Sequence, residues 1–264
     1  MFTIFGHTGF LGSNLAKYLK KYKIFLPPKK KFIFKKNLGN IIYCIGSDDW
    51  KKDTFNSFNA NLGYIPIIIK NNKFKSFTFI SSCRIYNNSQ TTIEDSKFKF
   101  NPIDSDEYYN LKKVLAENYL VSSKKKIKIV RVSNIFGFSP RSPLVFPMFV
   151  KNGLLRKKIF ISVNKNSSKD FIHIDDVVKL ITKIILKGKS QIYNIASGRN
   201  LKLGTLANEI KKRVKCKIIL KNQNIKIIEP KIDIRKIKRE FDFIPKKFIN
   251  DLDNIIGQYK KHFS

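Results

Sequence analysis

Three side chains near the middle of the chain have the types and spacing that proton and hydride chemistry requires. Tyr109 and Lys113 lie four residues apart, so a helix would stack them on one face. An ammonium beside a phenol, whose ordinary pKa is about 10, favours the tyrosinate and lets it act as a general acid or base. Ser82, at the end of an apolar run, would hold the reacting oxygen. Tyr108 and Lys112 have the same spacing and form a competing register.

A glycine-rich turn comes directly after the first apolar run of the chain. It reads Gly6-His7-Thr8-Gly9-Phe10-Leu11-Gly12, a G-x-x-G-x-x-G spacing. In such a turn Gly6 lets the strand reverse sharply, Gly9 lets the backbone approach a pyrophosphate, and Gly12 lets the next helix pack closely. The free N–H groups of that helix would bind the phosphates. The position predicts a dinucleotide site that includes Gly6, Thr8, Gly9, Phe10, Leu11 and Gly12.

The residues beyond this turn bear on the choice between NAD and NADP. NAD-binding domains carry an Asp or Glu about 20 residues after the glycines, where it accepts hydrogen bonds from the adenosine ribose. This chain has no carboxylate before Asp48, and the expected position falls among Lys29, Lys30 and Lys31. We therefore expect Lys29 to bind a 2′-phosphate and favour NADP, with NAD as the alternative because lysine is common throughout the chain.

Further motifs, taken in order, resemble the extended short-chain dehydrogenase/reductase family, the NAD-dependent epimerases and dehydratases of nucleotide sugars. Tyr109 and Lys113, with Glu117 four residues later, fit its Y-x-x-x-K pattern, whereas the Tyr108 register lacks the glutamate. Ser82 lies four residues before a tyrosine, as does the family's active serine. The other matches are Asn61, Arg131 to Gly137, Lys169 to Val177, Tyr193 to Gly198 and Arg239 to Pro245.

The resemblance implies a set of roles. It assigns catalysis to Ser82, Tyr109 and Lys113, with Tyr109 and Lys113 also binding the cofactor and Ser82 also contacting substrate. It places Asn134 and Lys169 beside the diphosphate of a nucleotide-sugar substrate. Lys169 stands where the family has an arginine, so it would keep the attraction but lose the bidentate geometry. The apolar faces of the helices expected near Asn56 and Tyr108 are either part of the core or, in the family's usual arrangement, the interface of a homodimer.

The reaction type depends on the two residues directly after Ser82. The dehydratases of the family place an Asp-Glu pair there, whereas this chain has Cys83 and Arg84. Carbon-acid epimerisation loses support as well, because Cys83 lies one residue too early for a proton-transfer cysteine and no histidine occurs between 138 and 150. A 4-keto reductase or a 4-epimerase remains. The missing adenosine carboxylates suggest an exchangeable cofactor, which favours the reductase.

These residues need a fold that brings strand ends and helix starts together. Apolar runs alternate with helical stretches through the first half, which predicts an α/β fold with a doubly wound parallel sheet of the Rossmann type. We expect strands at 2–5, 23–26, 41–45, 76–80 and 127–132, and helices at 11–21, 56–71 and 108–122.

The alternating pattern of apolar runs and helical stretches ends after Gly137, where prolines cluster at 140, 143 and 147. We therefore expect a dinucleotide-binding domain over 1–138 and a smaller mixed α/β substrate-binding lobe over 139–264. Roughly residues 171–195 are expected to pack back on the first domain. In the second lobe we expect a helix at 203–214 and short strands at 217–220 and 226–228.

The composition limits the possible partners. The 53 Lys and Arg residues outnumber the 19 Asp and Glu, giving a net charge of +34. They are spread from Lys17 to Lys261, so we do not expect a nucleic-acid partner, although a family member recruited for nucleic-acid binding or assembly is the alternative. The intact Ser82, Tyr109 and Lys113 argue against that alternative.

Three widely separated cysteines fit a reducing compartment and no metal site. The chain begins without a charged leader, and the apolar run near Pro66 is far shorter than the ~20 residues of a membrane helix, so we expect a cytoplasmic protein without a membrane partner. His173 is expected to be structural. Asp48, Asp49 and Trp50 are expected to flank the cofactor cleft without chemistry.

Overall fold

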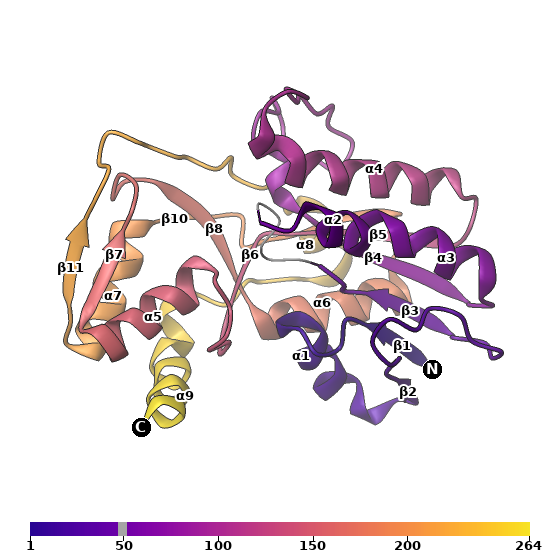
Figure 1. The fold of residues 1–264 in the computed structure, drawn as a ribbon, viewed down its shortest axis with the longest axis horizontal. Coiled ribbons are helices and arrows are strands. Elements are labelled where there is room, and N and C mark those ends of the chain that lie inside the picture. The colour runs from indigo at the N-terminus through magenta and orange to yellow at the C-terminus, as the bar shows by residue number, and fades with distance from the viewer. Residues whose placement is uncertain (47–51) are drawn as a thin grey trace.

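The computed structural model describes residues 1–46 and 52–264, and these residues form a parallel six-stranded sheet at the centre of the molecule (Figure 1). The strand order is β2-β1-β3-β4-β5-β9. Its strands are β1 (Phe2–Phe5), β2 (Ile24–Phe25), β3 (Asn40–Tyr43), β4 (Ser76–Ser82), β5 (Ile127–Val132) and β9 (Ile192–Ile195). The order reverses between β1 and β3, and ligands of such sheets bind at the carboxyl ends of the strands at this point.

Helices cover both faces of the sheet, because successive strand residues point to opposite sides (Figure 1). Ile4 and Val130 face one core with α1 (Phe10–Tyr18), the short helix η1 (Leu19–Lys21) and α6 (Ile174–Lys187). Phe5 and Ile129 face the other core. That core includes α3 (Tyr64–Asn71) and α4 (Tyr108–Ser122), preceded by α2 (Thr54–Phe58) and the π-helical turn η2 (Asn59–Gly63). The sheet is therefore buried on both faces, as a doubly wound Rossmann-like fold requires.

The second half of the chain builds a smaller mixed lobe beside the carboxyl edge of the sheet (Figure 1). Its strands form two small sheets, β10-β8-β6 and β11-β7. The elements are β6 (Asn134–Phe136), α5 (Val145–Arg156), β7 (Lys158–Ile161), β8 (Ser168–His173), β10 (Asn200–Lys202), α7 (Leu203–Val214), β11 (Lys217–Leu220) and α9 (Leu252–Phe263). Between β8 and β10 the chain returns to the first lobe, where α6 packs against α1 and β9 joins β5.

Most expected elements appear at or near their predicted positions, and those at 2–5, 108–122, 127–132, 203–214 and 217–220 have the predicted bounds. The strand predicted at 226–228 is wrong. Only Ile228 forms an isolated bridge, to Ser168, because the edge of β8 is occupied by β6 from Phe171 onward. The remaining short elements are η3 (Cys83–Tyr86), η4 (Ser105–Glu107), α8 (Arg235–Phe241) and η5 (Phe248–Asp251). Within the described ranges, no helix has both the length and the apolar character needed to span a membrane.

Candidate active site

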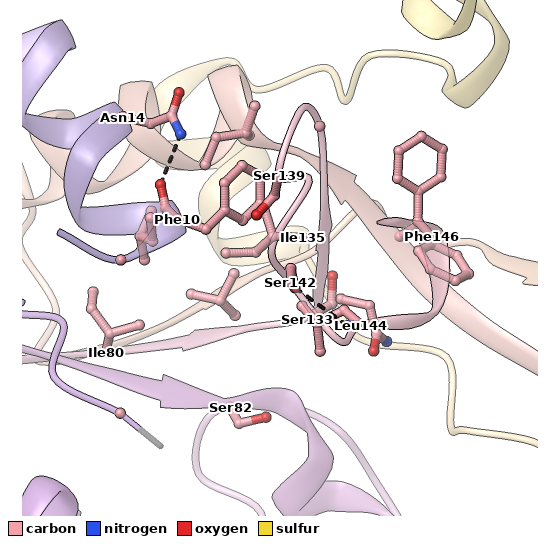
Figure 2. A pocket seen from close by; sticks show the side chains of 18 of the residues that line it. Phe10, Asn14, Ile80, Ser82, Ser133, Ile135, Ser139, Ser142, Leu144 and Phe146 are labelled. Carbon is pink, nitrogen blue, oxygen red and sulfur yellow. Dashed lines mark hydrogen bonds between the residues drawn. The ribbon is translucent and has the colours of Figure 1, made fainter. Parts of the chain in front are cut away.

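A cavity of about 1190 Å³ lies where the carboxyl edge of the sheet meets the second lobe. Figure 2 shows Phe10 of α1, Ser82 of β4 and Ser133, which links β5 to β6, arranged around it. A single small-molecule ligand fills a pocket of roughly 300–1,000 Å³. The cavity is therefore larger than the usual pocket for one small molecule.

The glycine turn forms one wall of this cavity. Gly6 has a positive φ of 81°, and a Cβ at Gly12 would overlap the carbonyl oxygen of Gly6, so both positions need glycine for the turn to close. A Cβ at Gly9 would meet only ordinary contacts, at 3.5 Å, which leaves the cavity side of the turn open. The N-terminus of α1 has no side-chain cap and no acidic residue in its first turn. Its backbone N–H groups can therefore receive a phosphate.

The expected dinucleotide residues divide into two groups. Thr8, Gly9, Phe10, Leu11 and Gly12 line the cavity, while Gly6 shapes the turn from behind. Lys29 is exposed on the segment after β2 and is not among the lining residues. Asp48, Asp49 and Trp50 lie outside the described residues.

Ser82, Tyr109 and Lys113 all line the cavity. Ser82 ends β4, and its Oγ accepts a hydrogen bond of 3.2 Å from the N–H of Arg84. The Lys113 ammonium donates to the carbonyl of Ile80 at 2.9 Å. Burial, with a smaller contribution from the charge of Lys112, lowers the pKa of Lys113 to about 7. The trio thus comes from the end of β4 and one face of α4.

Cations surround the ring of Tyr109. The Arg84 guanidinium lies 5.3 Å and the Lys112 ammonium 5.1 Å from the centre of the ring. The sequence did not indicate a role for Arg84, because the only feature that points to the site is its position two residues after Ser82. Both cations therefore lie within cation–π distance of this ring.

The side chains of the competing register, Tyr108 and Lys112, point toward α2 and away from the cavity. Tyr108 donates its hydroxyl to the carbonyl of Thr54 at 2.9 Å, and Lys112 donates to Ser57 Oγ, both toward α2. Burial, followed by the charge of Arg84, lowers the pKa of Lys112 to about 8. Neither Tyr108 nor Lys112 lines the cavity.

Glu117 and Arg131, both part of the motifs in the sequence, form a buried ion pair of 2.6 Å away from the cavity. Glu117 also accepts a hydrogen bond of 2.5 Å from Ser81, and Arg131 donates to the hydroxyl of Tyr86 at 2.6 Å. Burial lowers the pKa of Arg131, but the hydrogen bonds and charge of Glu117, with smaller contributions from Tyr86, together raise it above its ordinary value. These contacts fix α4 on β4 and β5, and so fix where Tyr109 and Lys113 lie.

The residues expected at the substrate diphosphate, Asn134 and Lys169, line the cavity on the side of the second lobe. Both contact one carboxylate. Glu229 forms an ion pair with Lys169 and accepts a hydrogen bond of 2.9 Å from the Asn134 amide. Sequence reasoning missed Glu229, because it lies 60 residues beyond Lys169 at the end of an isoleucine-rich stretch that carries no motif.

Asn61 and His173 are among the other polar residues that line the cavity. Asn61, in the π-helical turn, is buried and donates to the carbonyl of Ser57, while its Oδ1 has no hydrogen-bond partner among the described residues. His173 caps α6 by accepting from the N–H of Asp175, and its Nε2 lies 2.8 Å from Asp251. The contacts of His173 join α6 to the segment before α9.

Comparison with known proteins gives three kinds of similarity. The sequence model described as "NAD dependent epimerase/dehydratase family" matches residues 65–196, half of the chain. A dTDP-D-glucose 4,6-dehydratase of Dictyostelium discoideum is 26% identical over 252 aligned residues, covering 74% of this chain and 57% of that enzyme. A dTDP-4-dehydro-6-deoxyglucose reductase of Escherichia coli is 24% identical, covering 78% of this chain and 67% of that enzyme. The chain therefore spans little more than half the length of the first relative.

The solved structures share the fold at low sequence identity. MoeE5 in complex with UDP-glucose and NAD superposes with a TM-score of 0.83 at 13% identity, covering 100% of this chain and 99% of that chain. RMD from Pseudomonas aeruginosa, complexed with NADPH, has a TM-score of 0.77 at 17% identity, with 99% of both chains covered. Rossmann-like neighbours of this shape thus include one solved with NAD and one with NADPH.

Proposed function

The chain belongs to the NAD-dependent epimerase/dehydratase family, and from this membership we propose that it reduces the 4-keto group of a nucleotide-diphosphate sugar. One observation supports the proposal above all. Ser82, Tyr109 and Lys113 line the same cavity as the first residues of α1, whose N-terminus has no side-chain cap. The large volume of the cavity supports two ligands bound together.

The residues of the first turn suit a nicotinamide dinucleotide, because the open side of Gly9 and the free N–H groups of α1 would hold its diphosphate. When bound, this cofactor supplies or accepts the hydride. We propose NADP as the preferred form, since no carboxylate occurs before Asp48 and Lys29 lies just after β2. MoeE5 with NAD and RMD with NADPH provide a precedent in this fold for either form.

Each member of the trio has a distinct task. Tyr109 Oη gives a proton to the carbonyl oxygen of the sugar as that oxygen gains charge, and takes it back in the reverse direction. Lys113, whose ammonium donates to the carbonyl of Ile80, would hold the cofactor ribose and supply positive charge one helical turn from Tyr109. Ser82 Oγ donates a hydrogen bond to the same substrate oxygen and orients it.

Ketone reduction fits the site better than dehydration. Elimination of water needs an added acid and base, and the positions after Ser82 hold Cys83 and Arg84. The Cys83 thiol is buried and donates to the carbonyl of Arg131, and burial raises its pKa well above the ordinary value. The thiol therefore stays protonated near neutral pH and is poorly suited to act as the added base. The dTDP-4-dehydro-6-deoxyglucose reductase of Escherichia coli is a relative with the proposed reaction type.

Assays of hydride transfer test the proposal. Purified protein is mixed with NADPH or NADH and with dTDP-4-dehydro-6-deoxyglucose, dTDP-D-glucose or UDP-glucose, and the absorbance of the reduced cofactor is followed. We expect stoichiometric loss of NADPH with the keto sugar. Product formed without net consumption would identify a 4-epimerase instead. Tyr109→Phe should lower kcat by roughly 10²–10⁴-fold, whereas Tyr108→Phe, the matched control, should keep most of the activity.

We also propose that two copies of the chain associate through α2, α3 and α4. These helices carry exposed apolar side chains on the face of the sheet opposite α1 and α6, namely Phe55, Phe58, Ile67, Leu115, Tyr119 and Val121. Large exposed apolar side chains on neighbouring helices are typical of an interface. The cavity lies at the carboxyl edge of the sheet, so association would leave it accessible.

A further inference from the structure

The most unexpected feature of the cavity is the carboxylate that both predicted phosphate ligands already contact. Glu229 Oε1 is paired with the Lys169 ammonium, and Glu229 Oε2 accepts from the Asn134 amide at 2.9 Å. The side chains are largely enclosed, with 23% of Lys169 and 15% of Glu229 exposed. A negative group of the protein thus lies where an anionic substrate group would have to bind.

The backbone around this contact is held in place. The N–H of Glu229 donates to the carbonyl of Ser168 at 3.0 Å, and its carbonyl accepts from the Asn200 side chain at 2.5 Å. Asn134 and Lys169 belong to the paired strands β6 and β8. The Glu229 carboxylate can therefore leave its partners by side-chain rotation, without displacement of the surrounding strands.

The neighbouring carboxylate of Asp170 already has a full set of hydrogen-bond donors. Asp170 accepts from the hydroxyls of Ser133 and Ser197 and from the backbone N–H groups of Ser197 and Arg199. Its negative charge is therefore balanced within the loop that it supports. The Lys169 charge, in contrast, is matched by Glu229, a residue on a separate segment that faces the cavity.

We propose that Glu229 sets the affinity of the cavity for its substrate, because it competes with the substrate diphosphate for Lys169 and Asn134. The proposal rests on the nucleotide-sugar substrate proposed above. The Asn134 amide already donates both of its hydrogens, one to the carbonyl of Asp170 and one to Glu229, and like charges close together repel strongly in a partly enclosed site. Glu229 therefore keeps the donors oriented before substrate binds and weakens diphosphate binding, since its rotation must accompany entry of the substrate.

Equilibrium binding of UDP and dTDP by titration calorimetry tests this competition. Glu229→Gln removes the charge with little change of shape, and we expect it to bind the better of the two nucleotides about tenfold more tightly than the unaltered chain. The matched control is Glu209→Gln, which removes a carboxylate paired with Arg213 on α7, outside the cavity lining. Its binding should be unchanged. Adding Lys169→Gln to Glu229→Gln should abolish the gain.

A purely structural role for Glu229 could not produce tighter binding, so the sign of the change decides the proposal. Equal or weaker nucleotide binding by Glu229→Gln would overturn it, and so would failure of UDP and dTDP to bind any of the variants. Turnover is a separate measurement. If Glu229→Gln gains affinity while no variant binds NADPH or reduces a keto sugar, the competition stands and the proposed reaction fails. In an active enzyme the same change should lower KM and leave kcat unchanged.

Discussion

At the scale of single residues, Lys113 affects both the proposed reaction and the stability of the fold. Its ammonium is enclosed by β4 and α4, donates to the carbonyl of Ile80, and lies 4.8 Å from the ring centre of Phe79. An enclosed cation near a phenol suits proton transfer, but burial disfavours its charged form. The position that serves the proposed reaction therefore destabilises the fold while the lysine is charged.

The pH dependence of stability results from this burial. The pKa of Lys113 falls from 10.5 in the unfolded chain to about 7 in the folded one, so the penalty is complete below pH 7 and disappears as the pH rises toward 10.5. We expect the unaltered chain to gain stability relative to Lys113→Met over this window, by up to about 1.4 kcal/mol per pH unit. Urea unfolding at pH 7, 8, 9 and 10 measures the difference.

Lys179→Met provides the control, because this lysine is exposed on α6. Its stability relative to the unaltered chain should vary little over the same pH range. A difference between the unaltered chain and Lys113→Met that stays constant from pH 7 to 10 would contradict the assigned burial effect.

At the scale of elements, the turn from β1 into α1 depends on close approach of two backbone segments. Gly12 lies in the first turns of α1 and faces the carbonyl of Gly6. A methyl group there must displace backbone, since no flexible side chain is available to move. The same displacement would shift the N–H groups that are proposed to hold the diphosphate.

Gly12→Ala should therefore lower both stability and cofactor affinity. We expect a loss of roughly 1–3 kcal/mol in unfolding free energy, as for overpacking of a tight contact, together with weaker NADPH binding. Thermal unfolding and a fluorescence titration with NADPH check the two effects. The control is Gly257→Ala in α9, where an added Cβ meets nothing within 4 Å. That change should raise stability by up to about 1 kcal/mol through helix propensity and leave NADPH binding unaltered.

At the scale of the whole molecule, charge and apolar surface have separate consequences. The net charge of +34 is distributed over both lobes and should attract anionic nucleotides toward the cavity. The apolar side chains on α2, α3 and α4 instead suit a second copy of the chain. Leu115, 55% exposed on α4, lies one helical turn from Tyr119 on that surface.

Leu115→Glu should separate the proposed dimer, because a buried unpaired carboxylate strongly opposes association. We expect the dimer dissociation constant to rise by roughly 30-fold or more, as for a central interface residue. Light scattering coupled to gel filtration over a range of concentrations measures it. Ile244→Glu, at a position 86% exposed outside these helices, serves as the control. A monomeric mass for the unaltered chain at all concentrations would contradict the dimer.

The sequence alone determined the features that depend on local pattern. Apolar runs alternating with helical stretches determined the doubly wound sheet, because burial on both faces requires such runs. The spacing of Gly6, Gly9 and Gly12 determined the first turn, because the steric reason for each glycine involves only residues close to it in the sequence. The four-residue spacing of Tyr109 and Lys113 placed both on one face of α4 for the same reason.

Only the tertiary structure decided which distant groups meet. Glu229 lies 95 residues from Asn134, and nothing in the intervening sequence indicates that its carboxylate would contact that amide. Residues 226–228 have the composition of a strand, but a strand needs a free edge, and β6 occupies half of that edge of β8, from Phe171 to His173. Pairing of charges and strands depends on which segments the fold brings together, and local sequence patterns do not encode that information.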